Sequence, residues 1–275
     1  MKDSVYIIDG LAYVYRAYHS MPKLTNRHGH PVGALMGVHN LLNSLIRRYK
    51  PSRAVVVFDA PGKNFRHELY CDYKANRPPM PVDLVEQMQK IYALTRAMGF
   101  NVETVPGVEA DDVIGTLCKK LSSRNHNCLI FSSDKDLTQL VCTRVSLVCP
   151  YKDRVIKADQ VKEKFGVAPD RIIDYLTLVG DSADNIPGIP GVGPKTAARW
   201  LKKFGSLQGI IDQCNSIKGK AGCNLRDNLH LIELYKKLVT IKCDVKLNLE
   251  IEKLNFKESN NEVLQRIRNT IRTSL

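Results

Sequence analysis

Short apolar runs recur along the first half of the chain, and each is followed by a stretch of helical periodicity. Continuous apolar, β-branched runs bounded by turn residues are typical of buried strands, and strands alternating with helices indicate a mostly parallel sheet. The pattern predicts strands at 5–8, 54–58, 101–105 and 128–131, and helices at 34–48, 82–98 and 110–121. We therefore expect an α/β fold, with helices on both faces of a mostly parallel central sheet.

The second half of the chain has a different hydrophobic pattern. From about Ala158 onward the apolar positions keep a helical period and strand signals become sparse. No low-complexity linker and no internal repeat separates the halves. At roughly 150 residues per domain, a chain of this length accommodates two domains. We expect an α/β core over 1–157 and a helical region over 158–275.

Two basic stretches interrupt this pattern. Residues 61–81 form a long insertion, rich in Lys, Arg and Tyr, between a predicted strand and a predicted helix. Loops of that length are usually functional. The stretch 190–226 carries seven Lys and Arg residues against the single acid Asp212. Such a concentration of positive charge predicts contacts with phosphates.

Composition narrows the class of protein. The 275 residues include 44% hydrophobic residues, which excludes a wholly disordered chain, and the net charge of +13 favours nucleic acid as partner. The apolar run near the N-terminus is too short for a signal peptide, and no run is long enough to span a membrane. The eight cysteines show no CxxC spacing of a zinc site. We expect a cytoplasmic protein that binds nucleic acid.

Acidic residues gather where the predicted strands end. Three groups directly follow apolar runs, a fourth opens the helix at 110, and a fifth precedes a glycine-rich motif. Because the carboxyl ends of parallel strands meet at one edge of a sheet, we expect these side chains to share a crevice. They are Asp9, Asp59, Glu109, Asp111, Asp112, Asp134, Asp136, Asp181 and Asp184.

Any one of these acids could be a helix cap or a turn residue. Crowded together, however, carboxylates repel and raise one another's pKa unless a cation neutralises them. Oxygen ligands without His or Cys select hard ions such as Mg²⁺ or Mn²⁺. Nine acids exceed the needs of one such ion, and the number fits two ions sharing a site.

The glycine-rich motif nearly matches a phosphate-binding Walker loop. Pro194 stands where the lysine should follow Gly193, and turn sequence rather than a strand precedes the motif. A helix–hairpin–helix over 186–205 fits better, because a helix starting near Pro194 would present backbone amides to a DNA phosphate. The residues expected to contact DNA are Gly191, Gly193, Lys195, Thr196, Arg199 and Lys202.

Taken together, these motifs resemble the 5′-nuclease (flap endonuclease) family, most closely the 5′→3′ exonuclease domain of bacterial DNA polymerase I. The similar stretches run in family order through VYIIDGLAYVYRAYH, VVVFDAPGKNFRHELYCDYKANRPPMP, GVEADDVIGTL, SSDKDLTQLV, GDSADNIPGIPGVGPKTA and TIKCDV. Small departures are Ser133, where glycine is usual, and Pro194, and we expect neither to touch a metal ligand.

The resemblance implies a PIN-like fold and a structure-specific nuclease that cuts DNA near single-strand/double-strand junctions with two Mg²⁺ or Mn²⁺ ions. The first ion would be held by Asp9, Asp59, Glu109 and Asp111, and the second by Asp134, Asp136, Asp181 and Asp184, with Asp111 and Asp112 between them. The resemblance also implies a helical arch over 61–81, and a helix–three-turn–helix that in this family often holds K⁺. Residues expected to handle the scissile nucleotide are Arg16, Arg66, Tyr73, Lys74 and Arg77.

Two alternatives compete with the nuclease. A catalytically weak, structure-specific DNA-binding module predicts gaps among the acids, and none is missing. A PIN-like ribonuclease would lack the basic arch and the hairpin motif, and both are present. We therefore expect a monomer that acts on DNA with a 5′ flap or nick, beside a linked or separate DNA polymerase. We interpret Tyr13 and Tyr15 as core aromatics, and His19, His28 and His30 as surface or packing residues.

Overall fold

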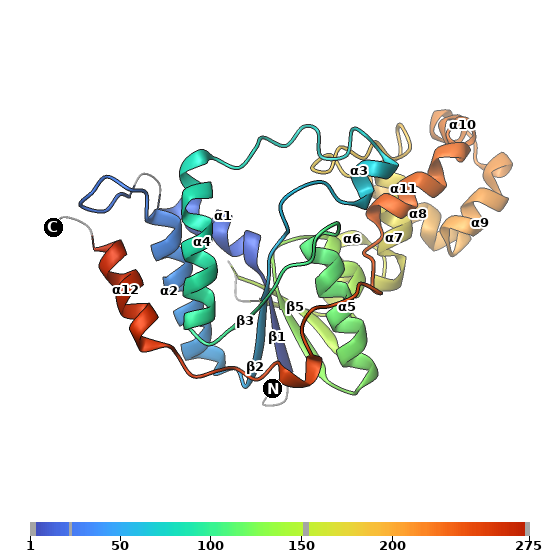
Figure 1. The fold of residues 1–275 in the computed structure, drawn as a ribbon. Coiled ribbons are helices and arrows are strands. Elements are labelled where there is room, and N and C mark those ends of the chain that lie inside the picture. The colour runs from blue at the N-terminus through green and yellow to red at the C-terminus, as the bar shows by residue number, and fades with distance from the viewer. Residues whose placement is uncertain (1–3, 22–23, 151–153, 273–275) are drawn as a thin grey trace.

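The computed structural model describes residues 4–21, 24–150 and 154–272, and its centre is a six-stranded sheet of order β3-β2-β1-β4-β5-β6 (Figure 1). Neighbouring strands are parallel except β5 and β6. In the register Ile7 lies opposite Val55 on one side and Ile130 on the other. The strands are β1 (Ser4–Asp9), β2 (Arg53–Val57), β3 (Asn101–Glu103), β4 (Asn127–Phe131), β5 (Val145–Cys149) and β6 (Arg154–Ile156).

The predicted α/β class is confirmed, and the four expected strands are present. The sequence pattern missed β5 and β6. Ser146 interrupts the apolar run of β5, and β6 is short with an exposed Arg154 at its start. Neither segment therefore shows the continuous apolar run that marked the inner strands.

Alternate strand residues separate two cores. Ile7 and Val55 pack with helix α5 (Ala110–Ser123), whereas Tyr6, Ile8 and Val56 face the opposite layer. That layer contains α1 (Gly10–Ser20), α2 (Gly33–Tyr49), α4 (Val82–Ala97) and α12 (Asn261–Ile271). Burial on both faces explains why the central positions of these strands, Val5–Ile8 and Ala54–Val57, are apolar without alternation.

The helical region continues the core on the α5 side of the sheet. Its helices are α6 (Ala158–Phe165), α7 (Ile172–Val179), α8 (Pro194–Phe204), α9 (Leu207–Asp212), α10 (Lys220–Asp227) and α11 (Ile232–Val239). Short 3₁₀ turns lie at Asp136–Leu140, Pro169–Arg171, Cys214–Ser216, Leu229–Leu231 and Ile251–Lys253.

After α11 the chain returns to the α/β layer. The amide of Ala54 donates to the Leu254 carbonyl at 3.1 Å, and α12 packs beside α4 with Leu264 and Ile267 in the core (Figure 1). The structure differs here from the predicted division, which placed all of 158–275 in the helical region. Apolar spacing along α12 shows that it has a face to bury, but not which layer covers it.

The insertion 61–81 is helical only over α3 (Phe65–Leu69). Turns follow as far as Arg77, and the remainder up to Pro81 is extended. Pro78, Pro79 and Pro81 explain this, because proline lacks the amide that a helix needs and disfavours helical backbone before it. The expected helical arch is therefore mostly a non-helical loop.

Among the described residues, no helix is long and apolar enough to cross a membrane.

Candidate active site

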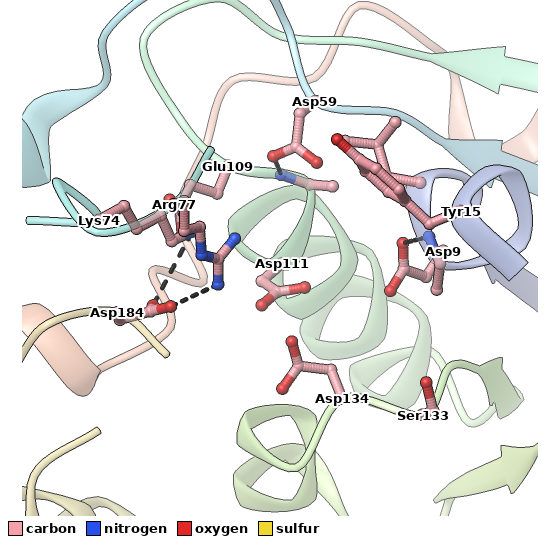
Figure 2. A pocket seen from close by; sticks show the side chains of 13 residues that line it. Asp9, Tyr15, Asp59, Lys74, Arg77, Glu109, Asp111, Ser133, Asp134 and Asp184 are labelled. Carbon is pink, nitrogen blue, oxygen red and sulfur yellow. Dashed lines mark hydrogen bonds and ion pairs between the residues drawn. The ribbon is translucent and has the colours of Figure 1, made fainter. Parts of the chain in front are cut away.

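Six of the nine predicted acids line one cavity of about 220 Å³ at the carboxyl edge of the sheet (Figure 2). They come from segments far apart in the chain: the ends of β1 and β2, the start of α5, and the loops after β4 and α7. The acids are Asp9, Asp59, Glu109, Asp111, Asp134 and Asp184, and they share the cavity with Leu11, Ala12, Tyr15, Lys74, Arg77, Ala110 and Ser133.

Helix starts explain why these carboxylates stand at this edge. Asp9 ends β1 and caps α1, because its Oδ1 accepts from the Ala12 amide at 3.0 Å. Asp59 accepts from the amide of Ala110, the first residue of α5, at 2.9 Å. Exposed amides and the helix dipole favour anions at such positions. The same local chemistry that starts each helix thus collects negative charge in one place.

Burial and crowding raise the pKa of several of these acids. Desolvation raises the pKa of Asp9 to about 6, with added repulsion from Asp59 and Asp134. Asp111, also desolvated and close to Asp134 and Asp9, has a pKa well above its ordinary value. Desolvation together with Asp134 and Asp181 raises the pKa of Asp136 to about 8. The site therefore lacks positive charge for the acids it holds.

Two cations of the insertion neutralise part of this cluster (Figure 2). Lys74 Nζ lies 2.5 Å from Glu109 Oε1 and 3.8 Å from Asp184 Oδ2, and Arg77 Nη2 lies 2.5 Å from Asp184 Oδ1. Burial alone would raise the pKa of Glu109, but Lys74 and Arg66 outweigh it and hold that pKa below its usual value. Glu109 is therefore ionised, and Glu109 and Asp184 are each paired with a cation of the insertion.

The donor set fits divalent ions. Every candidate ligand is a carboxylate, and Asp136 Oδ1 is a buried oxygen without a hydrogen-bond partner. Over the described ranges, no three acidic, His or Cys side chains converge closely enough to hold an ion as they stand. Lys74 and Arg77 occupy the space between Glu109 and Asp184, so ion binding there requires these cations to move.

The acids assigned to a second ion lie partly in the cavity and partly beside it. Asp136 and Asp181 do not line it, whereas Asp134 and Asp184 do. Lys135 Nζ pairs with Asp181 Oδ1 at 2.9 Å, and the Asp136 amide donates to Asp134 Oδ1 at 2.8 Å. The sequence indicated these acids but gave no role to Lys135, which is the cation paired with Asp181.

Arg66, Asp112 and Arg16 stand apart from the cavity. Arg66 and Asp112 are buried and bound to each other through both guanidinium ends, at 2.7 Å each. Arg16 donates to the Pro150 carbonyl at 2.7 Å and lines a separate, smaller cavity with Tyr13. In this arrangement none of the three side chains faces the carboxylate cavity.

Tyr73 is a buried side chain under the insertion. Its hydroxyl lies 2.8 Å from Asp184 Oδ2 and 3.1 Å from Glu109 Oε2, so it bridges these two acids. The expected contact of Tyr73 with the scissile nucleotide requires this ring to leave its present position.

Three residues of the site were missed by sequence reasoning. Ser132 Oγ donates to Asp9 Oδ2 at 2.7 Å and accepts from the Asp134 amide, joining the ends of β1 and β4. Asn64 Nδ2 donates to Glu109 Oε1 at 2.9 Å. Tyr15 packs against the core, as expected, but also lines the cavity. Only Ser132 carried a signal, because it directly follows a strand beside two acids.

The glycine motif joins α7 to α8. Gly193 precedes α8 with extended backbone, and Pro194 is the first helical residue. Gly191 has a φ of 79°, a conformation that favours glycine. Lys195, Arg199 and Lys202 are exposed and spaced to share one face of α8, whereas Thr196 is half-buried. This geometry is compatible with the predicted helix–hairpin–helix.

A parallel sheet with a carboxylate-lined cavity at its carboxyl edge and a helical region beside it defines a PIN-like nuclease architecture. Two family models match: the 5′-3′ exonuclease N-terminal resolvase-like domain over 4–166, and the 5′-3′ exonuclease C-terminal SAM fold over 167–262. The chain therefore belongs to the 5′-3′ exonuclease family. The predicted boundary at 157/158 lies close to the division between the two matches.

Similar proteins carry matching names. A 5′-3′ exonuclease of Buchnera aphidicola subsp. Baizongia pistaciae is 42% identical over 257 residues, covering 91% of this chain and 85% of that protein. DNA polymerase I of Pseudomonas aeruginosa is 45% identical over 266 residues, but this chain spans only 29% of its length. A bacteriophage T5 flap endonuclease, solved in complex with DNA and metal ions, has a TM-score of 0.74 at 23% identity, covering 98% of this chain and 99% of that one.

Proposed function

We propose that this 5′-3′ exonuclease hydrolyses phosphodiester bonds of DNA near single-strand/double-strand junctions, with two divalent metal ions in the carboxylate cavity. The observation that carries the proposal is the convergence of six acids from five segments on one cavity at the carboxyl edge of the sheet. A binding module without chemistry has no need of so much buried, mutually repelling charge.

The first ion would be held by Asp9, Asp59, Glu109 and Asp111, and the second by Asp134, Asp136, Asp181 and Asp184. Bound Mg²⁺ or Mn²⁺ supplies an activated hydroxide and stabilises the leaving oxygen. Ion binding requires the carboxyls of Asp9, Asp111 and Asp136 to lose the protons that burial favours. It would also require Lys74 and Arg77 to leave Glu109 and Asp184, and both cations would then be available to the entering phosphate.

The insertion and α8 handle different parts of the DNA in this proposal. Lys74 and Arg77 lie at the cavity, where a cation stabilises charge that develops on the reacting phosphate. The exposed face of Lys195, Arg199 and Lys202 follows the duplex backbone, with the amides of Gly191 and Gly193 at the helix start. A K⁺ ion would sit on carbonyls of the same turn.

The relatives support DNA and a DNA polymerase as partners of this chain. The T5 flap endonuclease complex contains DNA, and the polymerase I relatives carry a much longer chain. We propose a monomer in the cytoplasm, close to the nucleoid, that removes 5′ flaps and opens nicks during replication and repair alongside a DNA polymerase.

Incubation of the purified chain with a 5′-labelled flap duplex tests this function. We expect products with 5′-phosphates cut near the junction in Mg²⁺ or Mn²⁺, and none in EDTA. A blunt duplex and a single strand of the same sequence serve as control substrates, because neither contains a single-strand/double-strand junction. Flap binding without cleavage in either metal would instead support the silent DNA-binding module.

A further inference from the structure

Arg66 and Asp112 form a buried ion pair that joins three parts of the molecule. Arg66 belongs to α3 at the root of the insertion, and Asp112 belongs to the first turn of α5. The guanidinium also donates to the Leu238 carbonyl at 2.9 Å and to the Thr240 carbonyl at 2.8 Å, where α11 ends. The guanidinium of Arg66 therefore connects the insertion 61–81, helix α5 and the helical region.

The hydrogen bonds of Asp112 leave it no free position for a metal ion. Oδ1 accepts from Arg66 Nη2 at 2.7 Å and from the Lys242 amide at 2.8 Å. Oδ2 accepts from Arg66 Nη1 at 2.7 Å and from the Glu109 amide at 3.0 Å. The side chain is fully buried, and each oxygen already has two donors. Asp112 is thus a carboxylate whose acceptors are satisfied within the protein.

The neighbours of this pair are two proposed ligands of the first ion. Asp112 fixes the backbone of Glu109 through the capping bond, and Arg66 Nη1 lies 3.5 Å from Glu109 Oε2. Asp111 is adjacent in the same first turn and points into the cavity (Figure 2). Mutation of residues that orient metal ligands through such contacts typically changes metal affinity 10–100-fold.

We propose that Arg66 and Asp112 are positioning residues, which hold Glu109 and Asp111 in place for the first metal ion and do not touch metal or DNA themselves. This replaces the direct roles that the family resemblance implied for them, and it rests on the proposed metal site. The fork geometry of Arg66 is essential to it, because four acceptors on two segments, α5 and the end of α11, require a planar, multidentate donor.

The test measures Mn²⁺ binding to the whole chain without DNA, from the electron paramagnetic resonance signal of free Mn²⁺, beside thermal unfolding. Asp112→Asn removes the charge and keeps the shape, and Arg66→Lys keeps the charge and loses the fork. We expect both to raise the Kd for Mn²⁺ by about 10–100-fold. If Asp112→Asn does not fold, the Kd of Arg66→Lys for Mn²⁺ still tests the positioning role.

Thr116→Val is the matched control. Thr116 lies one turn further along α5, is fully buried, and accepts from the Val245 amide at 3.1 Å, so it ties α5 to the same returning segment. We expect this variant to melt earlier and to bind Mn²⁺ like the wild type. Wild-type Mn²⁺ affinity in Asp112→Asn and Arg66→Lys, or equal weakening in Thr116→Val, would overturn the positioning role.

Asp111→Ala separates this inference from the proposed function. If wild type and Asp111→Ala bind Mn²⁺ equally, the proposed metal site itself is wrong. If Asp111→Ala loses binding while Asp112→Asn and Arg66→Lys retain it, only the positioning role fails.

Discussion

Replacing Asp136 by asparagine should stabilise the metal-free protein and remove its activity. Asp136 has a pKa of about 8 because it is desolvated and lies near Asp134 and Asp181, and its buried Oδ1 has no hydrogen-bond partner. The folded state therefore binds a proton at this carboxyl at pH values where the unfolded chain, with an ordinary aspartate, has released it. Asparagine keeps the shape without the charge.

The magnitude follows from proton linkage. A carboxyl whose folded pKa is raised makes the fold less stable as pH rises from its unfolded to its folded pKa. One such group contributes a slope of about −1.4 kcal/mol per pH unit. Between about pH 5 and about pH 7 the variant should therefore gain roughly 3 kcal/mol relative to the wild type, or roughly 5–10 °C in Tm.

The assay is thermal unfolding in EDTA across that pH range, with Asp227→Asn, at an exposed acid in the helical region, as control. The Tm of wild type and control should fall with pH more steeply than that of Asp136→Asn. Added Mg²⁺ should recover more Tm in the wild type than in the variant, which should no longer cleave flaps. Equal slopes in all three proteins would refute the argument.

The remaining predictions concern metal and DNA. Asp111→Ala should abolish cleavage while flap DNA still binds, measured by gel shift, and near-normal turnover would contradict its ligand role. Lys74→Ala should lower the single-turnover rate more than the affinity, since the cation acts as charge develops on the phosphate. Lys195→Ala should instead weaken binding and reduce the salt slope by about one unit. Finally, Mg²⁺ affinity, followed by calorimetry, should rise between about pH 6 and about pH 8 as Asp9 and Asp136 lose their protons.

The parts of the fold that sequence could predict are those governed by local pattern. Strands buried on both faces have continuous apolar runs at their centres, so β1, β2 and β4 could be predicted, whereas Ser146 interrupts the run of β5 and hid that strand. The acids of the cavity could also be predicted from the sequence, because parallel strands end at one edge of the sheet and Asp9 and Asp59 stand where strands end. Local pattern does not show long-range pairing, so it could not place α12 beside α4 rather than with the helical region.

The same limit applies within the site. An acid three residues from Glu109 looks like a second ligand on one helix face, but Asp112 turns to Arg66 because Leu238 and Thr240 supply further acceptors there. That choice depends on a segment more than a hundred residues away. Likewise, nothing local shows that Lys74 and Arg77 reach across to acids from α5 and the loop after α7.

The return of the chain after α11 also determines how this protein can be divided. Residues 4–166 match one family model, yet Leu264 and Ile267 complete the apolar layer over α4, and the Leu254 carbonyl holds the start of β2. A fragment that ends at residue 166 would expose that layer and lack the Leu238 and Thr240 carbonyls that accept from Arg66. The two halves should therefore fold as one cooperative unit, and separately expressed fragments should regain structure only when mixed.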